Sequence, residues 1–351
     1  MADPVHLHIN AIDTLMFRDG RPFNQNDAGA SEAVSVFPPY PPTVVGAVRA
    51  ALWKQLPKWD TDKLGTGTNW QKDKLGPLKF GPPTLLFDGE PVFPVPLHIL
   101  EGKVSDSGKE KELTRLAPES KPEPKRESDL GKAQLPVPKN PALLGVKPIE
   151  DRWVNVAGMN KILNGGTPDE DDFIKRTDLW SSEPRVGIGI TPDTRTTTDG
   201  QLYMATHTRM ADNVSLYVQL HGWGGKFETA LRPLAGEHRM AQMESKKTGP
   251  KLPDAPTNIG DKYCVILMSP MVLENMPKPG ENIGNLPGKL VSACTGKPVS
   301  IGGWDSPNKQ PVPLRQCYPA GSVFFMQGGA PPDAIGMATE WGFGQILIGK
   351  W

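Results

Sequence analysis

The sequence predicts an α+β protein made of short strands and short helices joined by many shaped loops. Glycine and proline are unusually frequent, at 37 and 38 of 351 residues, and long helical bundles do not tolerate so many of them. Apolar residues alternate with polar ones in several short segments, a pattern that is typical of half-buried strands. The length allows two domains of ordinary size or one large domain with insertions.

The N-terminal part has the order strand, helix, hairpin. Apolar residues occupy the odd positions of residues 6–17, HLHINAIDTLMF, with an interruption at Asp13, and they predict a half-buried strand. We expect a helix from an N-cap at Thr43 to Leu56, with one apolar face. Residues 84–100 predict two strands around an Asp-Gly turn. This order is the first half of a ferredoxin-like or RRM-like unit.

The stretch from about residue 101 to residue 135 differs in composition from its surroundings. It mixes acidic and basic residues with prolines and has almost no large apolar residues. Such a segment cannot bury a core of its own, so we expect a solvated insertion.

The second half of the chain is rich in predicted strands. In residues 186–190, Val and Ile alternate with Gly187 and Gly189, and glycine inside a strand often marks a close approach by a backbone or a ligand. Further strands are expected at VSLYVQL, GEHRMAQME, KYCVILMSP, SVFFMQ and GQILIGKW, and short helices at NVAGMNKILNGG and GGKFETALRPL. This pattern predicts a second α+β domain. We place the domains at residues 1–165, which include the insertion, and at residues 166–351.

Charge and motif content exclude several functional classes. The 39 basic and 39 acidic residues balance, which excludes wholesale coating of a polyanion but not a groove lined locally by arginine. The three cysteines lie far apart and form no CxxC pair, so neither a zinc site nor a disulfide framework is expected. No targeting segment or long apolar run is visible, so we expect a soluble cytoplasmic protein with no membrane contact.

The candidate acid–base residues form no recognisable catalytic set. His207 and His238 lie near arginines in the sequence and could cleave RNA in principle, but neither has an adjacent nucleophile. His6 and His8 have no third metal ligand nearby in the sequence. We therefore expect no catalytic residue, no metal site and no cofactor.

The segment MFRDGRPF, residues 16–23, suggests a different activity. Arg18 and Arg21 flank an Asp-Gly turn at the end of the first predicted strand, and a phenylalanine lies beyond each arginine. Arginine forks bind phosphates, and exposed rings stack on bases. The alternation places Phe17 in the buried set, so Phe23 is the ring expected to be exposed. The alternative is a surface turn whose arginines are merely solvated.

Several segments together resemble a known family. MFRDGRPF, PPYPPTVVGAVRAAL, LFDGEPVFPVPLHIL, EPRVGIGITPDTRTTTDGQLY, GEHRM and EWGFGQILIGKW occur in this order. They resemble the RAMP-superfamily subunit that binds the crRNA 5′ tag in type III-B (Cmr) CRISPR effector complexes. The resemblance spans nearly the whole chain except the charged insertion, and in LAGEHR the residue Ala235 replaces a glycine that is usual in the family.

The resemblance implies two ferredoxin-like (RRM-like) domains packed together, with long loop insertions. It implies a non-catalytic subunit that holds the crRNA 5′ tag in antiviral defence. The implied partners are the crRNA, the large polymerase/cyclase-like subunit, the adjacent RAMP backbone and small subunits and, indirectly, the target RNA. A single-stranded tag of constant sequence suits such a protein, because its bases can be splayed and read while phosphate contacts set its position.

The expected RNA contacts are mostly arginines. The glycine face of the strand at residues 186–190 would let the RNA backbone come close, with an arginine near either end. The full expected set is Arg18, Arg21, Phe23, Arg49, Arg185, Gly187, Gly189, Arg195, Arg209 and Arg239. Two other functions stay open: a RAMP-type endoribonuclease that processes crRNA with His207 or His238 as its base, and an RNA-free scaffold subunit that contacts only proteins.

Overall fold

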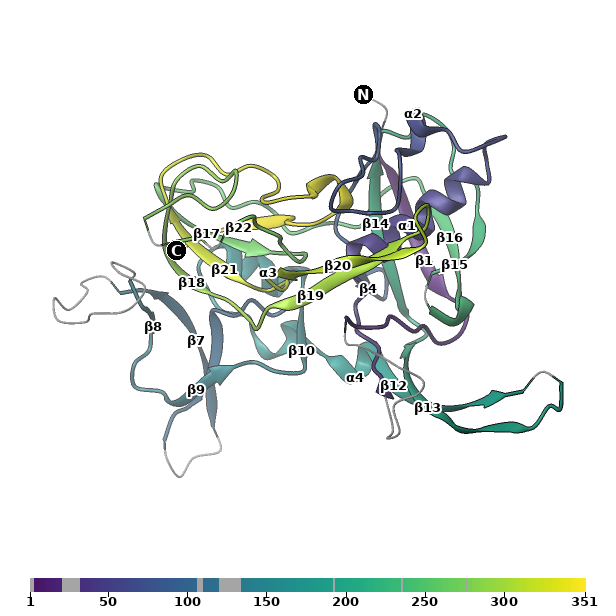
Figure 1. Ribbon diagram of the computed structural model, residues 1–351. Coiled ribbons are helices and arrows are strands. Elements are labelled where there is room, and N and C mark those ends of the chain that lie inside the picture. Colours follow the sequence, from purple (N-terminus) through teal and green to yellow (C-terminus); the bar gives the residue numbers. More distant parts are fainter. Residues whose placement is uncertain are drawn as a thin grey trace.

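The computed structural model shows a mixed α/β fold in which strands dominate and helices are few (Figure 1). It describes residues 3–20, 32–105, 110–119, 134–191, 193–234, 236–275, 277–278 and 280–351. The predicted α+β class is thus confirmed at the level of strands and helices. Among the described residues, no helix is long and apolar enough to cross a membrane.

The largest sheet joins strands from both halves of the chain. Its strand order is β11-β10-β5-β4-β14-β1-β16-β15, with β3 paired to β14. The boundary predicted at residue 165 therefore falls between strands that share one sheet. The strands are β1 (Val5–Ala11), β3 (Lys79–Phe80), β4 (Thr84–Phe87), β5 (Glu90–Pro94), β10 (Arg152–Asn155), β11 (Phe173–Lys175), β14 (Val214–His221), β15 (Ala230–Pro233) and β16 (Met240–Lys246).

Helix α1 (Pro41–Trp53) supplies much of the core that this sheet shares. Its apolar side Val44, Val48 and Leu52 is fully buried, in the same cluster as the inward residues of β1. The helix begins two residues before the expected N-cap at Thr43, because the fixed backbone of proline suits its first turn. A short second helix, α2 (Thr61–Leu64), follows it.

A second sheet is built from the C-terminal part of the chain, in the order β18-β21-β17-β22. Helix α3 (Val156–Leu163) packs between this sheet and the first one, sharing an apolar cluster with both. In β22, a Cβ at Gly349 would lie 3.3 Å from the backbone of Leu163, so glycine allows the helix to approach closely. The strands are β17 (Lys262–Leu267), β18 (Lys289–Cys294), β21 (Val323–Gln327) and β22 (Ile346–Lys350).

The expectation of a solvated insertion at residues 101–135 holds for residues 103–105 and 110–112, which are exposed, but not for residues 114–118, which are largely buried. Strands β6 (Ile99–Lys103), β7 (Lys111–Pro118), β8 (Pro136–Pro138) and β9 (Leu144–Pro148) form a sheet in the order β8-β7-β6-β9. Within β7, Thr114 and Arg115 are buried, and Arg115 donates a hydrogen bond of 2.9 Å to the carbonyl of Lys350. This segment is held by hydrogen bonds between strand backbones and by the packed aliphatic part of the Arg115 side chain. Neither contribution is visible in a count of large apolar residues, on which the expectation was based. Residues 106–109 and 120–133 lie outside the described residues.

Two hairpins complete the described fold. Strands β12 (Trp180–Ile190) and β13 (Thr197–Met210) form a long hairpin, to which the short β2 (Glu32–Ala33) adds. Strands β19 (Val299–Asp305) and β20 (Gln310–Cys317) form the other. The short helices are α4 (Arg176–Leu179), η1 (Glu170–Asp172), η2 (Gly236–His238) and η3 (Thr339–Trp341). The helix predicted at GGKFETALRPL is wrong, because residues 230–233 pair as β15 with β16 instead.

Candidate nucleic-acid interface

The hairpin of β12 and β13 extends away from the body of the protein (Figure 1). Val186, Ile188 and Ile190 are exposed by 65%, 49% and 57%, so the apolar residues of the predicted strand face solvent. Gly187 and Gly189 alternate with them along β12 and are partly exposed. This strand was expected from its alternation, but its apolar face contributes nothing to the described core.

Arg195 lies in the turn that connects the two strands of this hairpin. It is exposed and has a φ of 52°, a left-handed backbone conformation. Its backbone N–H donates to the carbonyl of Thr191 at 2.8 Å, which closes the turn. The structure thus places Arg195 at the tip of the hairpin, far along the strands from the other predicted arginines.

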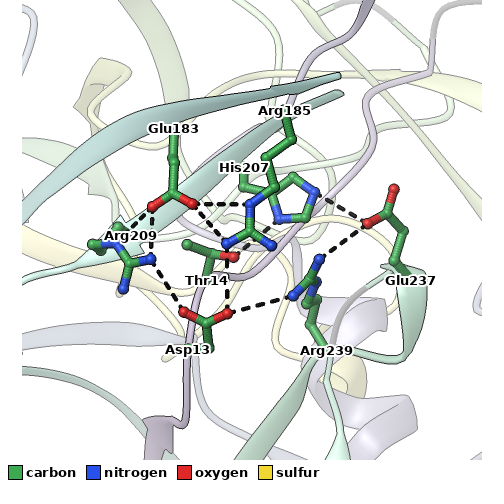
Figure 2. A network of polar contacts seen from close by, with 8 residues as sticks. All are labelled: Asp13, Thr14, Glu183, Arg185, His207, Arg209, Glu237 and Arg239. Atoms are coloured by element: carbon green, nitrogen blue, oxygen red, sulfur yellow. Dashed lines mark hydrogen bonds and ion pairs between the residues drawn. The ribbon is translucent and has the colours of Figure 1, made fainter. Parts of the chain in front are cut away.

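At the root of the hairpin, polar side chains from four segments meet (Figure 2). The segment after β1 is tied to β13 by backbone hydrogen bonds of 2.9 and 2.8 Å between Leu15 and Thr208. On β12 and β13, residues two apart share a face, and the pairing of Glu183 with His207 places both strands' polar residues together. We call the group the root network: Asp13, Thr14, Glu183, Arg185, His207, Arg209, Glu237 and Arg239.

Asp13 is the centre of the root network. Its carboxylate lies 3.1 Å from Nη2 of Arg209, 3.5 Å from Nη2 of Arg185 and 3.4 Å from Nη1 of Arg239. Each of these arginines comes from a different strand or turn. The three guanidinium groups therefore converge on one carboxylate.

Two further carboxylates hold the outer sides of the same arginines. Glu183 accepts from Nε and Nη2 of Arg185 through one oxygen, at 2.9 and 2.6 Å, and from Nε of Arg209 through the other, at 2.7 Å. Glu237 lies 3.3 Å from Nη2 of Arg239. The formal charges of the three arginines and the three carboxylates cancel. The predicted arginines are thus assembled, but they are already ion-paired.

The pKa values of the acidic groups follow from these contacts. The backbone N–H of Thr14 is the main cause that lowers the pKa of Asp13, and Arg209 and Arg185 add to it. Hydrogen bonds from Arg209 and then Arg185 lower the pKa of Glu183. Both carboxylates are therefore ionised at neutral pH, and the side chains of all three arginines remain partly open to solvent.

His207 is a buried member of the root network. Its side chain is inaccessible, with Nδ1 at 3.0 Å from the hydroxyl of Thr14 and Nε2 at 3.1 Å from Glu237, the latter outside hydrogen-bond geometry. Burial lowers the pKa of His207, although Glu237 partly opposes the effect. The imidazole of His207 is thus enclosed between Thr14 and Glu237. His238, by contrast, is exposed, with a φ of 55°.

The described part of the MFRDGRPF segment, residues 16–20, lies beside the root network. The carbonyl of Met16 accepts from the backbone N–H of Gly236 at 2.8 Å, which joins the turn to the segment that carries Glu237. Arg18 is exposed, and Phe17 is buried as predicted. A Cβ at Gly20 would lie 2.8 Å from a terminal methyl of Leu314, so the turn packs closely against the β19–β20 hairpin. Arg21 and Phe23 lie outside the described residues.

Arg49 is not at this surface, and its expected role in RNA binding is corrected by the structure. It belongs to α1, on the buried side of the helix, and is 1% exposed. Its Nε donates to the carbonyl of Leu64 at 2.8 Å, and its Nη1 donates to the carbonyl of Gly67 at 2.6 Å. The rings of Trp59 and Trp341 lie 5.1 and 5.5 Å from its guanidinium carbon. Burial lowers the pKa of Arg49 to about 10. A phosphate has no access to it.

Sequence reasoning missed the acidic half of the site and one cavity. The interruption of the first strand's apolar alternation by Asp13 was a usable signal, as was Glu183 two residues before Arg185. A cavity of about 220 Å³, which no residue of the root network lines, is bordered by prolines and by Phe37, Tyr40 and Trp153. Among the described residues, no group of three or more His, Cys, Asp or Glu side chains could hold a metal ion.

Comparisons with known proteins agree with this fold. A family model described as CRISPR-associated protein (Cas_Cmr3) matches residues 7–351. A chain of a cryo-EM structure of the type III-B Cmr-beta, bound to cognate target RNA and AMPPnP, is similar with a TM-score of 0.53 and 17% identity, covering 91% of this chain and 86% of that chain. A second such structure, bound to cognate target RNA, gives a TM-score of 0.51 with the same identity and coverage. No curated protein sequence matches the chain significantly.

Proposed function

The chain belongs to the Cas_Cmr3 family of CRISPR-associated proteins, and we propose that it is a non-catalytic crRNA-binding subunit of a type III-B effector complex. In this proposal it holds the 5′ tag of the crRNA and docks the large polymerase/cyclase-like subunit, beside the RAMP backbone and small subunits. Target RNA meets the complex through the crRNA and not through this chain directly.

One observation carries the RNA-binding part: three arginines from separate segments converge at the root of an exposed hairpin (Figure 2). The turn beside them has a further exposed arginine, Arg18. Guanidinium groups bind phosphate oxygens in bidentate fashion, and phosphate contacts set the position of a single strand. Along β12, Gly187 and Gly189 have no side chains. The face of the strand between the root network and Arg195 at the tip therefore leaves room for an RNA backbone to approach. This path suits an extended single strand.

The carboxylates of the root network determine which forces can bring RNA to its arginines. Because they balance the arginines, the network has no excess positive charge to attract RNA from a distance. Binding there relies on short-range hydrogen bonds, and long-range attraction must come from other cations, for which the arginines of the sequence segment MFRDGRPF are the expected source. We therefore propose that the turn and the root network act together.

A direct test measures how RNA binding by the purified full chain depends on salt. The double variant Arg185→Ala, Arg209→Ala should bind a single-stranded RNA that carries the tag at least tenfold more weakly, with a salt slope lower by about one to two units. The matched control is Arg152→Ala, Arg176→Ala, which removes two ion-paired arginines elsewhere on the surface. Equal losses in both double variants would contradict the assignment of the site.

An RNA-free scaffold is the second candidate, and the exposed apolar stripe of Val186, Ile188 and Ile190 favours it. Such a stripe is typical of a surface that contacts protein. If the isolated chain shows no salt-dependent RNA binding, and no small RNA of uniform 5′ end copurifies with it, the scaffold function replaces our proposal.

The endoribonuclease alternative lacks a positioned base at the root network, because His207 is enclosed there. Incubating the chain with a repeat-containing RNA in the absence of metal tests this alternative. We expect intact RNA for the wild type and for His238→Ala alike. Cleavage that disappears in His238→Ala would show that the chain is an enzyme.

A further inference from the structure

The surroundings of the Asp13 carboxylate have the composition of an oxyanion site. Guanidinium nitrogens of three arginines lie within 3.1 to 3.5 Å of it, and the backbone N–H of Thr14 hydrogen-bonds to it as well. All these groups are donors. A carboxylate and the two free oxygens of a phosphodiester present similar pairs of anionic acceptors, and arginine forks bind both.

The other two carboxylates of the network would keep these donors in place without Asp13. Glu183 bonds to both Arg185 and Arg209, and Glu237 lies beside Arg239. In addition, Nε of Arg239 is buried and has no hydrogen-bond partner. The arginines are therefore fixed from their outer sides, with their inner sides directed at the place that Asp13 occupies (Figure 2).

Fold stability alone is a weak reason for this arrangement. The side chain of Asp13 is 49% exposed, and exposed ion pairs contribute little to stability because water and salt screen them. Asp13 also interrupts an otherwise apolar alternation in the sequence. A carboxylate that is accessible from solvent and surrounded only by donors can be replaced by an external anion.

We propose that the position of the Asp13 carboxylate is a phosphate-binding site, and that Asp13 holds this site in the free chain until a phosphodiester of single-stranded RNA takes its place. The proposal deepens the RNA-binding function proposed above and rests on it for the identity of the ligand. It assigns Asp13 the role of an internal competitor. Glu183 and Glu237 are positioning residues for the arginines.

The substitution Asp13→Ala vacates the site and gives the network one excess positive charge. Inorganic phosphate, compared with chloride at equal ionic strength, should then raise the melting temperature of Asp13→Ala but not that of the wild type. The control is Asp151→Ala, which removes an exposed carboxylate from its pair with Arg176 and changes the net charge equally. If phosphate stabilises neither variant, or both equally, the proposal is wrong.

RNA binding gives the second readout. Asp13→Ala should bind single-stranded RNA about threefold to tenfold more tightly than the wild type, with a salt slope steeper by about one unit, since one competing carboxylate is gone. Asp151→Ala should show at most a small change. Weaker binding by Asp13→Ala with a lowered melting temperature would mean that Asp13 is purely structural, and it would overturn the proposal.

The two readouts separate this inference from the proposed function. If phosphate stabilises Asp13→Ala while no variant binds RNA, the oxyanion site stands and the RNA function fails. If the wild type binds RNA with the expected salt dependence but Asp13→Ala gains neither phosphate stabilisation nor affinity, this inference alone fails. Should Asp13→Ala not fold, Asp13→Asn keeps the side-chain volume and is measured in the same way, with unchanged or weaker RNA binding as the refuting result.

Discussion

Replacing Arg49 by methionine should destabilise the fold and leave RNA affinity unchanged. The guanidinium donates to two buried carbonyls, at 2.8 and 2.6 Å, and each hydrogen bond from a charged group contributes roughly 1.5–3 kcal/mol. Methionine preserves the packing of the side-chain stem and removes the cost of burying a charge, which offsets part of the loss. We expect the free energy of unfolding to fall by about 2–4 kcal/mol, as the carbonyls of Leu64 and Gly67 lose their donor.

Urea denaturation gives the change in unfolding free energy, and an RNA titration on the same preparation gives the affinity per folded molecule. Arg49→Lys serves as a companion, because it keeps the charge but loses the planar fork that reaches both carbonyls. We expect it to be destabilised as well. A stable Arg49→Met protein that has lost its RNA affinity would refute the structural assignment and restore Arg49 to the RNA-binding set.

Three further outcomes are expected. The double variant Arg18→Ala, Arg21→Ala should weaken crRNA binding by about 2–4 kcal/mol in filter-binding titrations, with an unchanged melting temperature; a large drop in melting temperature at constant affinity would contradict this. Deleting Lys111–Pro118 should yield an aggregated or protease-sensitive protein, because the strand packs in a sheet; a soluble, protease-resistant product would show that it does not. Burial lowers the pKa of His98 to about 3, with a smaller effect of Arg115, so the free energy of unfolding falls by about 1.4 kcal/mol per pH unit below about pH 6.5. His98→Phe should flatten this part of the profile of unfolding free energy against pH. An equally steep profile in the variant would exclude His98 as its cause.

The sequence was most informative where local chemistry determines local structure. The Asp88-Gly89 hairpin, helix α3 and the strand expected at residues 186–190 (the end of β12) are present, and the first strand is present up to Ala11, short of its expected end at Phe17. Alternation and turn residues act over a few positions, so a single sequence displays them. The buried state of Phe17 followed from the same alternation.

The misses involve contacts between distant residues. β15 pairs with β16, which overrode a weak helical pattern at GGKFETALRPL. The burial of Arg49 depends on the carbonyls of Leu64, at the end of α2, and of Gly67, in the loop after it, and no periodicity in the sequence predicts that these approach Arg49. The second half of β7 is largely buried although the strand is mostly polar, and Arg115 in it donates a hydrogen bond to the carbonyl of Lys350, which lies far along the chain.

The candidate site was predicted in part. The arginines at residues 185, 209 and 239 were singled out from the sequence, and the structure brings them together. Their convergence on Asp13 could not be predicted, since it requires β1, β12, β13 and the turn before β16 to meet at one place. The net charge of zero for the whole chain did not indicate that the charges of three arginines and three carboxylates cancel within one cluster. Whether each arginine contacts RNA stays a prediction.

Whether this chain holds the 5′ tag can be measured by photo-crosslinking it to a crRNA with 4-thiouridine placed in the tag. Peptide mapping should locate the crosslinks in the turn at residues 16–20 and in the root of the β12–β13 hairpin, and they should weaken in Arg185→Ala, Arg209→Ala. Probes placed in the guide region of the same RNA should give few crosslinks to these peptides. Crosslinks from the tag that map only to other surfaces, or none at all while the guide crosslinks strongly, would contradict the account.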